Sequence, residues 1–134
     1  MQFKEGSAVN FWLYMFLTTL LIPAVMLFLG YRFKNGGPKK INHFFGYRTS
    51  RSMKNRDTWD FAHRRCGAYW SWLGWPFLSA ALLYMPTLRR AGDEIISLAA
   101  TILVLIQLLV MCLVVIPTER ALKRTFDEKG NRIG

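Results

Sequence analysis

The fold is decided by the sequence IISLAATILVLIQLLVMCLVVIPT, residues 95–118, which contains no Lys, Arg, Asp or Glu. Two further stretches, residues 6–31 and 66–88, also lack these four residue types. Each stretch exceeds the roughly 20 residues that an α-helix needs to cross about 30 Å of hydrocarbon. A water-soluble helical core would instead require charged helix faces, which these stretches lack. The sequence therefore predicts an all-α, polytopic membrane protein with spans at about residues 9–31, 66–86 and 94–116.

The basic residues are distributed unevenly around these spans. The net charge is +10, with ten Lys or Arg in the loop 32–65 and five in the tail 118–134. Only Lys4, Arg89 and Arg90 remain for the opposite side. Three spans place the loop and the tail on one side, so the positive-inside rule predicts an external N-terminus and a cytoplasmic C-terminus. We expect membrane lipids, not nucleic acid, to be the partners of this charge.

The chain of 134 residues leaves little room for a separate soluble unit. We therefore expect a single membrane domain, residues 1–134. Three helices enclose little volume on their own, so a homo-oligomer is one expected arrangement.

The loop 32–65 is too apolar for a solvated linker and too charged for the bilayer core. Asn55 is suited to cap a helix that starts at Arg56, with Asp57 in the favourable first turn. This interfacial helix is expected to continue into the second span. Trp59 is expected at the depth of the lipid headgroups, where aromatic side chains are enriched.

Proline and small residues shape the expected packing of the spans. Pro23 interrupts the hydrogen bonds of the first helix, and the hydroxyl of Thr19, four residues earlier, is placed to satisfy the carbonyl group that is freed. The spacing Gly67-x-x-x-Ser71 favours a close approach between helices.

Few polar groups lie within the spans. Gln107 is the strongly polar central residue of the third span. This span is expected to end at Pro117. A hydrogen bond from Gln107 to a neighbouring helix is favoured over a place on a transport path. Three tryptophans of the second span favour an aromatic belt over a ligand cage (Trp70, Trp72, Trp75).

The most specific part of the chain is GYRTSRSMKNRDTW, residues 46–59, which we call the signature loop. It resembles the pattern of the SdpI family of small bacterial membrane proteins: a G-Y-R-T element, an S-x-K-N element, a Trp and an A-x-R run. Here the last of these is Ala62-His63-Arg64. The candidate binding residues of this loop are Gly46, Tyr47, Arg48, Thr49, Ser52, Lys54, Asn55 and Trp59.

Two interpretations of the signature loop stay open at this point. Its cationic side chains can bind phosphate, which Arg can do with two parallel hydrogen bonds. Alternatively, Arg48 pairs with Asp57 or Asp60 and fixes the loop against the interfacial helix. Its hydroxyl and amide groups suit local turns and caps.

Catalysis finds little support. His43 and His63 could act as bases, and His63 and Cys66 could supply two metal ligands, but no further ligands complete a site. No glycine-rich phosphate loop is present. We expect no catalytic residue, no metal and no cofactor, and hence not an enzyme.

The family resemblance implies a multi-pass protein of the bacterial cytoplasmic (inner) membrane that gives immunity to a membrane-active peptide toxin. It also implies signalling from the loop to a cytoplasmic repressor. The alternative is a lipid- or small-solute-binding component of a membrane transport system, suggested by Gln107 and the tryptophans.

Overall fold

The computed structural model describes residues 2–133, and the side chains of residues 6, 7 and 9–133. Lys4 and Gly134, which belong to the predicted outer side and the predicted tail, lie outside these described side chains. The helices are α1 (Gln2–Phe33), α2 (Arg56–Tyr84), a 3₁₀ turn η1 (Met85–Leu88), α3 (Asp93–Leu113) and α4 (Val115–Thr125). Within the described residues the extended structure is limited to one isolated bridge, Phe126 with Arg132, so the all-α prediction is confirmed.

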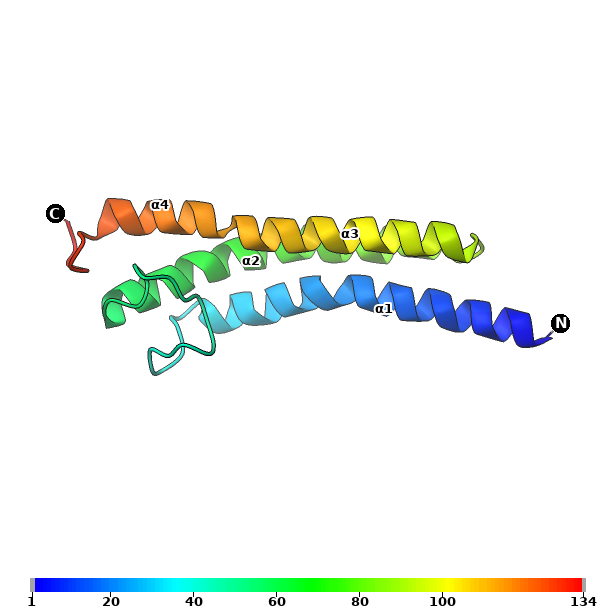
Figure 1. Cartoon of the computed structure of the whole chain (residues 1–134), viewed down its shortest axis with the longest axis horizontal. Helices are drawn as coiled ribbons and strands as arrows, with labels where there is room; N and C mark the ends of the chain where they lie inside the picture. Colours follow the sequence, from blue (N-terminus) through cyan, green and yellow to red (C-terminus); the bar gives the residue numbers. More distant parts are fainter. Residues whose placement is uncertain (1, 134) are drawn as a thin grey trace.

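The helices form three antiparallel rods, because α4 continues nearly in line with α3 (Figure 1). The loop after α1 and the residues after α4 lie at one end of the molecule, which we call the loop end; η1 lies toward the opposite end, which we call the turn end (Figure 1). Most of α1 packs against α2 and α3, while α4 packs against α2. The basic loop and tail therefore share one end, as three antiparallel rods require.

Two helical segments are long and apolar enough to cross a membrane, Val9–Phe33 and Asp93–Thr125. These correspond to the first and third predicted spans. The helix α2 lies between them in the chain but has a more polar first half and several tryptophans. Its role as a third span, residues 66–86, stays a prediction.

The start of α2 follows the prediction closely. Asn55 is the N-cap: its side-chain oxygen accepts from the Thr58 N–H at 2.9 Å, and the Asn55 N–H donates to the Thr58 hydroxyl at 3.1 Å. This reciprocal pair satisfies backbone donors that have no partner in the first turn of a helix. The helix then runs without a break from Arg56 to Tyr84.

The third rod does not stop at Pro117, as the sequence had suggested. The helix is interrupted only at Val114, whose backbone angles stay in the right-handed helical region, and α4 continues to Thr125. Pro117 lies in the first turn of α4, where its missing N–H removes no essential hydrogen bond and its fixed φ angle suits a helix. The first eight residues of the predicted tail are therefore helical.

The backbones of α1 and α2 nearly touch near the loop end. A Cβ atom added to Gly30 would lie 2.9 Å from the Gly67 carbonyl oxygen, and one added to Gly67 would lie 2.9 Å from the Gly30 carbonyl oxygen. Ser71 lies against the same position of α1. The small residues at this crossing thus allow the close approach predicted from the Gly67-x-x-x-Ser71 spacing.

Outside the loop end, two side-chain hydrogen bonds join α1 to the rest of the bundle, one from an indole and one from an amide. The Trp12 Nε1–H donates to the Met85 carbonyl at 2.9 Å, and buried Gln107 donates from Nε2 to the Thr19 carbonyl at 3.1 Å. The prediction that Gln107 bonds to a neighbouring helix is confirmed.

The Gln107 hydrogen bond also corrects the expectation for Pro23. Because proline lacks an N–H, the Thr19 carbonyl has no helical donor four residues later. The Thr19 hydroxyl bonds instead to the Phe16 carbonyl at 2.7 Å. The freed carbonyl is satisfied from α3, by Gln107, and not from within α1.

Trp72 and Trp75 line one open groove on the outer surface, together with Tyr31 and Lys34. They are 82% and 57% exposed, whereas Trp70 donates its Nε1–H to the Met111 carbonyl at 3.3 Å. Trp70 therefore packs between helices, and the aromatic belt stays a prediction for the other two.

Candidate functional site: the signature loop and its contact with α4

The chain enters the loop end through a tight turn that α2 holds in place. Gly36 has a φ angle of +122°, a backbone conformation that favours glycine. The Gly37 N–H donates to the Asp60 carboxylate at 3.0 Å, and the Trp59 indole N–H donates to the Pro38 carbonyl at 3.0 Å. Arg56 also donates to the Pro38 carbonyl, at 2.8 Å. The turn after α1 is therefore fixed by side chains from the first turns of α2.

A buried histidine joins the signature loop to α2. His63 accepts at Nε2 from the Tyr47 N–H at 2.8 Å, and its Nδ1 lies 2.7 Å from the Trp59 carbonyl. A carbonyl can only accept, so the proton of the neutral ring is on Nδ1. Burial lowers the pKa of His63, which favours this neutral form.

Gly46 is required where the loop passes His63. Its φ angle is +108°, and a Cβ atom at this position would lie 2.4 Å from His63 Nε2. Both the backbone conformation and the space therefore exclude a side chain.

Thr49 and Ser52 close a small turn in the middle of the signature loop. The Thr49 N–H donates to the Ser52 hydroxyl oxygen at 2.9 Å, and the Ser52 N–H donates to the Thr49 hydroxyl oxygen at 3.2 Å. Ser52 is fully buried, and its hydroxyl also lies 3.0 Å from the Tyr47 carbonyl. These contacts match the predicted use of hydroxyl groups in local turns.

The loop is tied to α4 by Glu119. Its Oε1 accepts from the Tyr47 hydroxyl at 2.7 Å and from the Thr49 hydroxyl at 2.6 Å. Arg51 lies 3.9 Å from the other carboxylate oxygen. Burial, together with the nearby negative charge of Glu119, raises the pKa of Tyr47, so the phenol stays protonated and continues to donate.

The residues after α4 return to the start of α2. Asn55, besides capping α2, donates from Nδ2 to the Gly130 carbonyl at 2.7 Å. Arg132 donates to both carboxylate oxygens of Asp57 at 2.8 Å, and these hydrogen bonds lower the pKa of Asp57. The loop end thus brings together four separate parts of the chain.

The candidate residues divide into two groups. Tyr47, Ser52 and Trp59 are buried, and Gly46, Thr49 and Asn55 make the loop contacts described above. Arg48 and Lys54 are exposed. The loop therefore has a buried structural side and an exposed cationic side.

One of the two interpretations of the loop, the pairing of Arg48 with Asp57 or Asp60, is wrong. Arg48 donates to the His43 carbonyl, while Asp57 pairs with Arg132 of the tail and Asp60 pairs with Arg56, one turn earlier on α2, at 2.9 Å. Trp59 is fully buried, against His63. Its depth relative to the lipid headgroups stays a prediction.

Gln107 is not part of this site. It lies within α3 and contacts Thr19 of α1.

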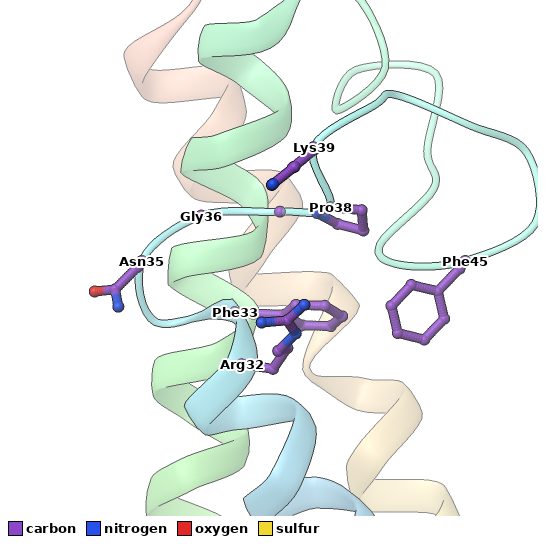
Figure 2. A pocket seen from close by; sticks show the side chains of 8 residues that line it. Arg32, Phe33, Asn35, Gly36, Pro38, Lys39 and Phe45 are labelled. Atoms are coloured by element: carbon purple, nitrogen blue, oxygen red, sulfur yellow. The ribbon is translucent and has the colours of Figure 1, made fainter.

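A cleft of about 410 Å³ opens beside the first turn of the loop. In Figure 2, Arg32 and Phe33 lie below the turn and Lys39 lies above it. Phe45 lies across the gap from Phe33. The rings of Phe33 and Phe45 have centroids 5.9 Å apart. This cleft has a mixed cationic and aromatic lining beside the signature loop.

The sequence did not single out Glu119, nor the hydrogen bonds of His63 and Asp60 with the loop backbone. One signal was available for Glu119, which is the single acidic residue between positions 95 and 126. A lone carboxylate at the end of a membrane span, among basic residues, indicates a specific partner. No comparable signal marks the contact of His63 with the Tyr47 N–H, which depends on the loop path.

The hydrogen bonds of this site hold the loop against α2 and α4. Both ring nitrogens of His63 are engaged within the protein. Among the described residues no group of three His, Cys, Asp or Glu side chains is placed to hold a metal ion.

Comparison with known proteins shows to which family the chain belongs. The profile of the SdpI/YfhL protein family matches residues 39–118, more than half of the sequence. The chain belongs to the SdpI/YfhL family. It is 32% identical over 121 residues to the uncharacterized protein YfhL of Bacillus subtilis (strain 168), covering 88% of this chain and 98% of that protein. No solved structure matches it. The SdpI/YfhL match begins within the first turn of the loop and includes the signature loop, α2, α3 and the start of α4.

Proposed function

We propose that this SdpI/YfhL family member protects a bacterial cell against a membrane-active peptide toxin and signals the encounter through its signature loop. The proposal rests on family membership and on one structural observation. Tyr47 and Thr49, both signature residues, share the Glu119 carboxylate of α4. Since α4 continues the apolar helix α3, this contact connects a membrane helix directly with the loop.

The mechanism follows from that connection. The helices present apolar faces outward, including Leu98, Leu109 and Phe28, which suit contact with an amphipathic peptide in the bilayer. A peptide that displaces α3 also moves α4 and the Glu119 carboxylate. The Tyr47 and Thr49 hydrogen bonds then change, and with them the presentation of Arg48 and Lys54. A cytoplasmic repressor is the partner proposed for this cationic surface.

A survival assay tests the proposal. Cells with and without the protein are exposed to a membrane-active peptide toxin, and the membrane abundance of each variant is measured in parallel. Arg48→Ala should reduce signalling or protection at normal abundance, whereas Leu105→Ile, which conserves volume on an exposed helix face, should not. Arg48→Lys should also be impaired, because Lys supplies only a point charge. Equal sensitivity of cells with and without the protein would exclude the immunity function.

For the transport alternative, Gln107 gives less support, because it uses its amide N–H to satisfy a carbonyl of α1. Trp72 and Trp75 line an open groove on the outer surface. Uptake or release of a small solute with unchanged toxin survival would nevertheless favour transport over immunity.

For the membrane we propose the bacterial inner membrane, with α2 as a third span and the loop end in the cytoplasm. Fifteen basic residues in the loop and tail support this orientation. Cysteines introduced one at a time near residues 37 and 91 should be labelled by an impermeant reagent only near residue 91. Labelling near residue 37 from outside would reverse the orientation.

A further inference from the structure

A second basic cleft lies between α2 and α4, on surfaces that the signature loop does not use. Its volume is about 440 Å³, and three arginines line it: Arg65 from α2, and Arg120 and Arg124 from α4. Tyr69 and Pro117 complete the side that faces the apolar part of the bundle.

The charge of this cleft is not compensated within the protein. Arg120 and Arg124 are four residues apart on one helix, a spacing that brings like charges together at an energetic cost. No acidic side chain lines the cleft. Glu119, the acidic neighbour in sequence, is engaged by Tyr47 and Thr49. Among the described residues, none of the three arginines has an ion-pair partner. An anion would remove this repulsion.

The position of the cleft identifies the kind of anion. The apolar run of the third rod ends at Pro117, and the arginines lie in the next two turns toward the loop end. Tyr69, on the adjacent turn of α2, has the amphipathic ring that is enriched where hydrocarbon meets water. The cleft is therefore at the boundary between apolar and polar surface, where lipid phosphates lie.

We infer that this cleft binds the phosphate headgroup of an anionic phospholipid. Guanidinium groups match phosphate oxygens with two parallel hydrogen bonds. Basic pockets between membrane helices on the cytoplasmic side are suited to such headgroups. The acyl chains would then lie along the exposed apolar surface of α2 and α3, and the lipid would join α2 to α4. This inference is independent of toxin immunity.

The test measures lipid binding to the full chain. Purified protein in a mild detergent is titrated with phosphatidylglycerol or with phosphatidylcholine of the same acyl chains, and bound lipid is counted by native mass spectrometry. We expect tighter binding of phosphatidylglycerol. Arg120→Gln/Arg124→Gln should weaken it by about tenfold or more, from the loss of hydrogen bonds to a charged group. Lys123→Gln/Lys129→Gln removes the same charge from exposed positions outside the cleft and should cost clearly less.

A conservative variant separates geometry from charge. Arg65→Lys keeps the net charge but loses the planar fork, so binding should fall although general electrostatic attraction is unchanged. Circular dichroism of each variant reports whether the helices are intact; if the double arginine variant has lost helix, Arg65→Lys decides. Equal losses in the two double variants, or full binding by Arg65→Lys, would overturn the site.

A final arm distinguishes a lipid from free phosphate. Inorganic phosphate is added in millimolar excess to the protein bound to phosphatidylglycerol. A bound lipid headgroup with acyl chains on the helices should be retained. Release of the lipid, with phosphate binding that the double arginine variant loses, would overturn the lipid assignment and show a phosphate site instead.

Discussion

The loop end and the turn end of this protein are held together by different chemistry. At the loop end, side chains from α2 and α4 satisfy the backbone of an irregular segment: His63 the Tyr47 N–H, Asp60 the Gly37 N–H, and Trp59 the Pro38 carbonyl. Toward the turn end, regular helices satisfy their own backbone and meet through apolar contacts with few added hydrogen bonds. In a regular helix an apolar residue can be replaced by another of similar volume, whereas each loop contact needs one kind of group at one position.

The strongest test of this difference is Gly46→Ala. The positive φ angle and the short distance to His63 Nε2 should destabilise the protein by about 3 kcal/mol, seen as a lower thermal midpoint in detergent. Gly6→Ala is the matched control, because no atom lies within 4 Å of the added Cβ. Equal midpoints for the two variants would show that the loop end is not specifically packed.

The next test removes the contact between the loop and α4. Glu119→Ala removes the acceptor of the Thr49 hydroxyl and leaves the Tyr47 hydroxyl with only a long contact of 3.4 Å to the Val115 carbonyl, which should cost about 2 kcal/mol. Trypsin should then cleave at Arg48 and Arg51 faster than in the unmodified protein. Glu128→Ala removes the same charge from an exposed position and should not change the cleavage rate. Rapid cleavage of the unmodified protein in membranes would instead show a mobile loop.

A smaller effect is expected in the helical part. Gln107→Leu should cost about 1 kcal/mol, the usual size of a hydrogen bond between membrane helices. Pro23→Ala supplies an N–H for the Thr19 carbonyl, so Gln107→Leu should cost less in that background. Unfolding of the four proteins in a double-mutant cycle measures this coupling. Strictly additive effects would contradict the assignment of Gln107 to the carbonyl that proline frees.

The smallest expected effect is a loss of stability at low pH, which is absent at neutral pH. Burial lowers the pKa of His63, so below about pH 6.5 the unfolded chain binds a proton that the folded protein does not. The contribution of neutral His63 to stability should therefore be fully present above this pH. It should fall as the pH is lowered toward the pKa of His63 in the folded protein. His63→Gln should flatten this dependence, whereas His43→Gln, at an exposed position, should keep it. Thermal midpoints between pH 5 and 8 provide the measurement.

The sequence predicted best what depends on neighbouring residues. Hydrocarbon length and charge-free runs predicted the helical class, and the spacing of Asn55 and Arg56 predicted the start of α2. Contacts over long separations were missed. The turn at Pro38, 21 residues earlier, accepts the indole N–H of Trp59. Asp57, one of the two acidic partners considered for Arg48, pairs with Arg132 of the tail, while Asp60 pairs with Arg56 one turn earlier on α2.

The place where the α1 and α2 backbones meet has a mechanical consequence. Gly30 is three residues from the end of α1 at Phe33 but 28 residues from its start at Gln2, or about 5 Å against about 40 Å at 1.5 Å per residue. If α1 tilts as a rod about this contact, the crossing acts as a fulcrum with arms in a ratio of about one to nine. A displacement of several ångströms at the far end then reaches the loop as less than one ångström, but with a correspondingly larger force. Hydrogen bonds such as that from the Tyr47 N–H to His63 are sensitive to movements of this size.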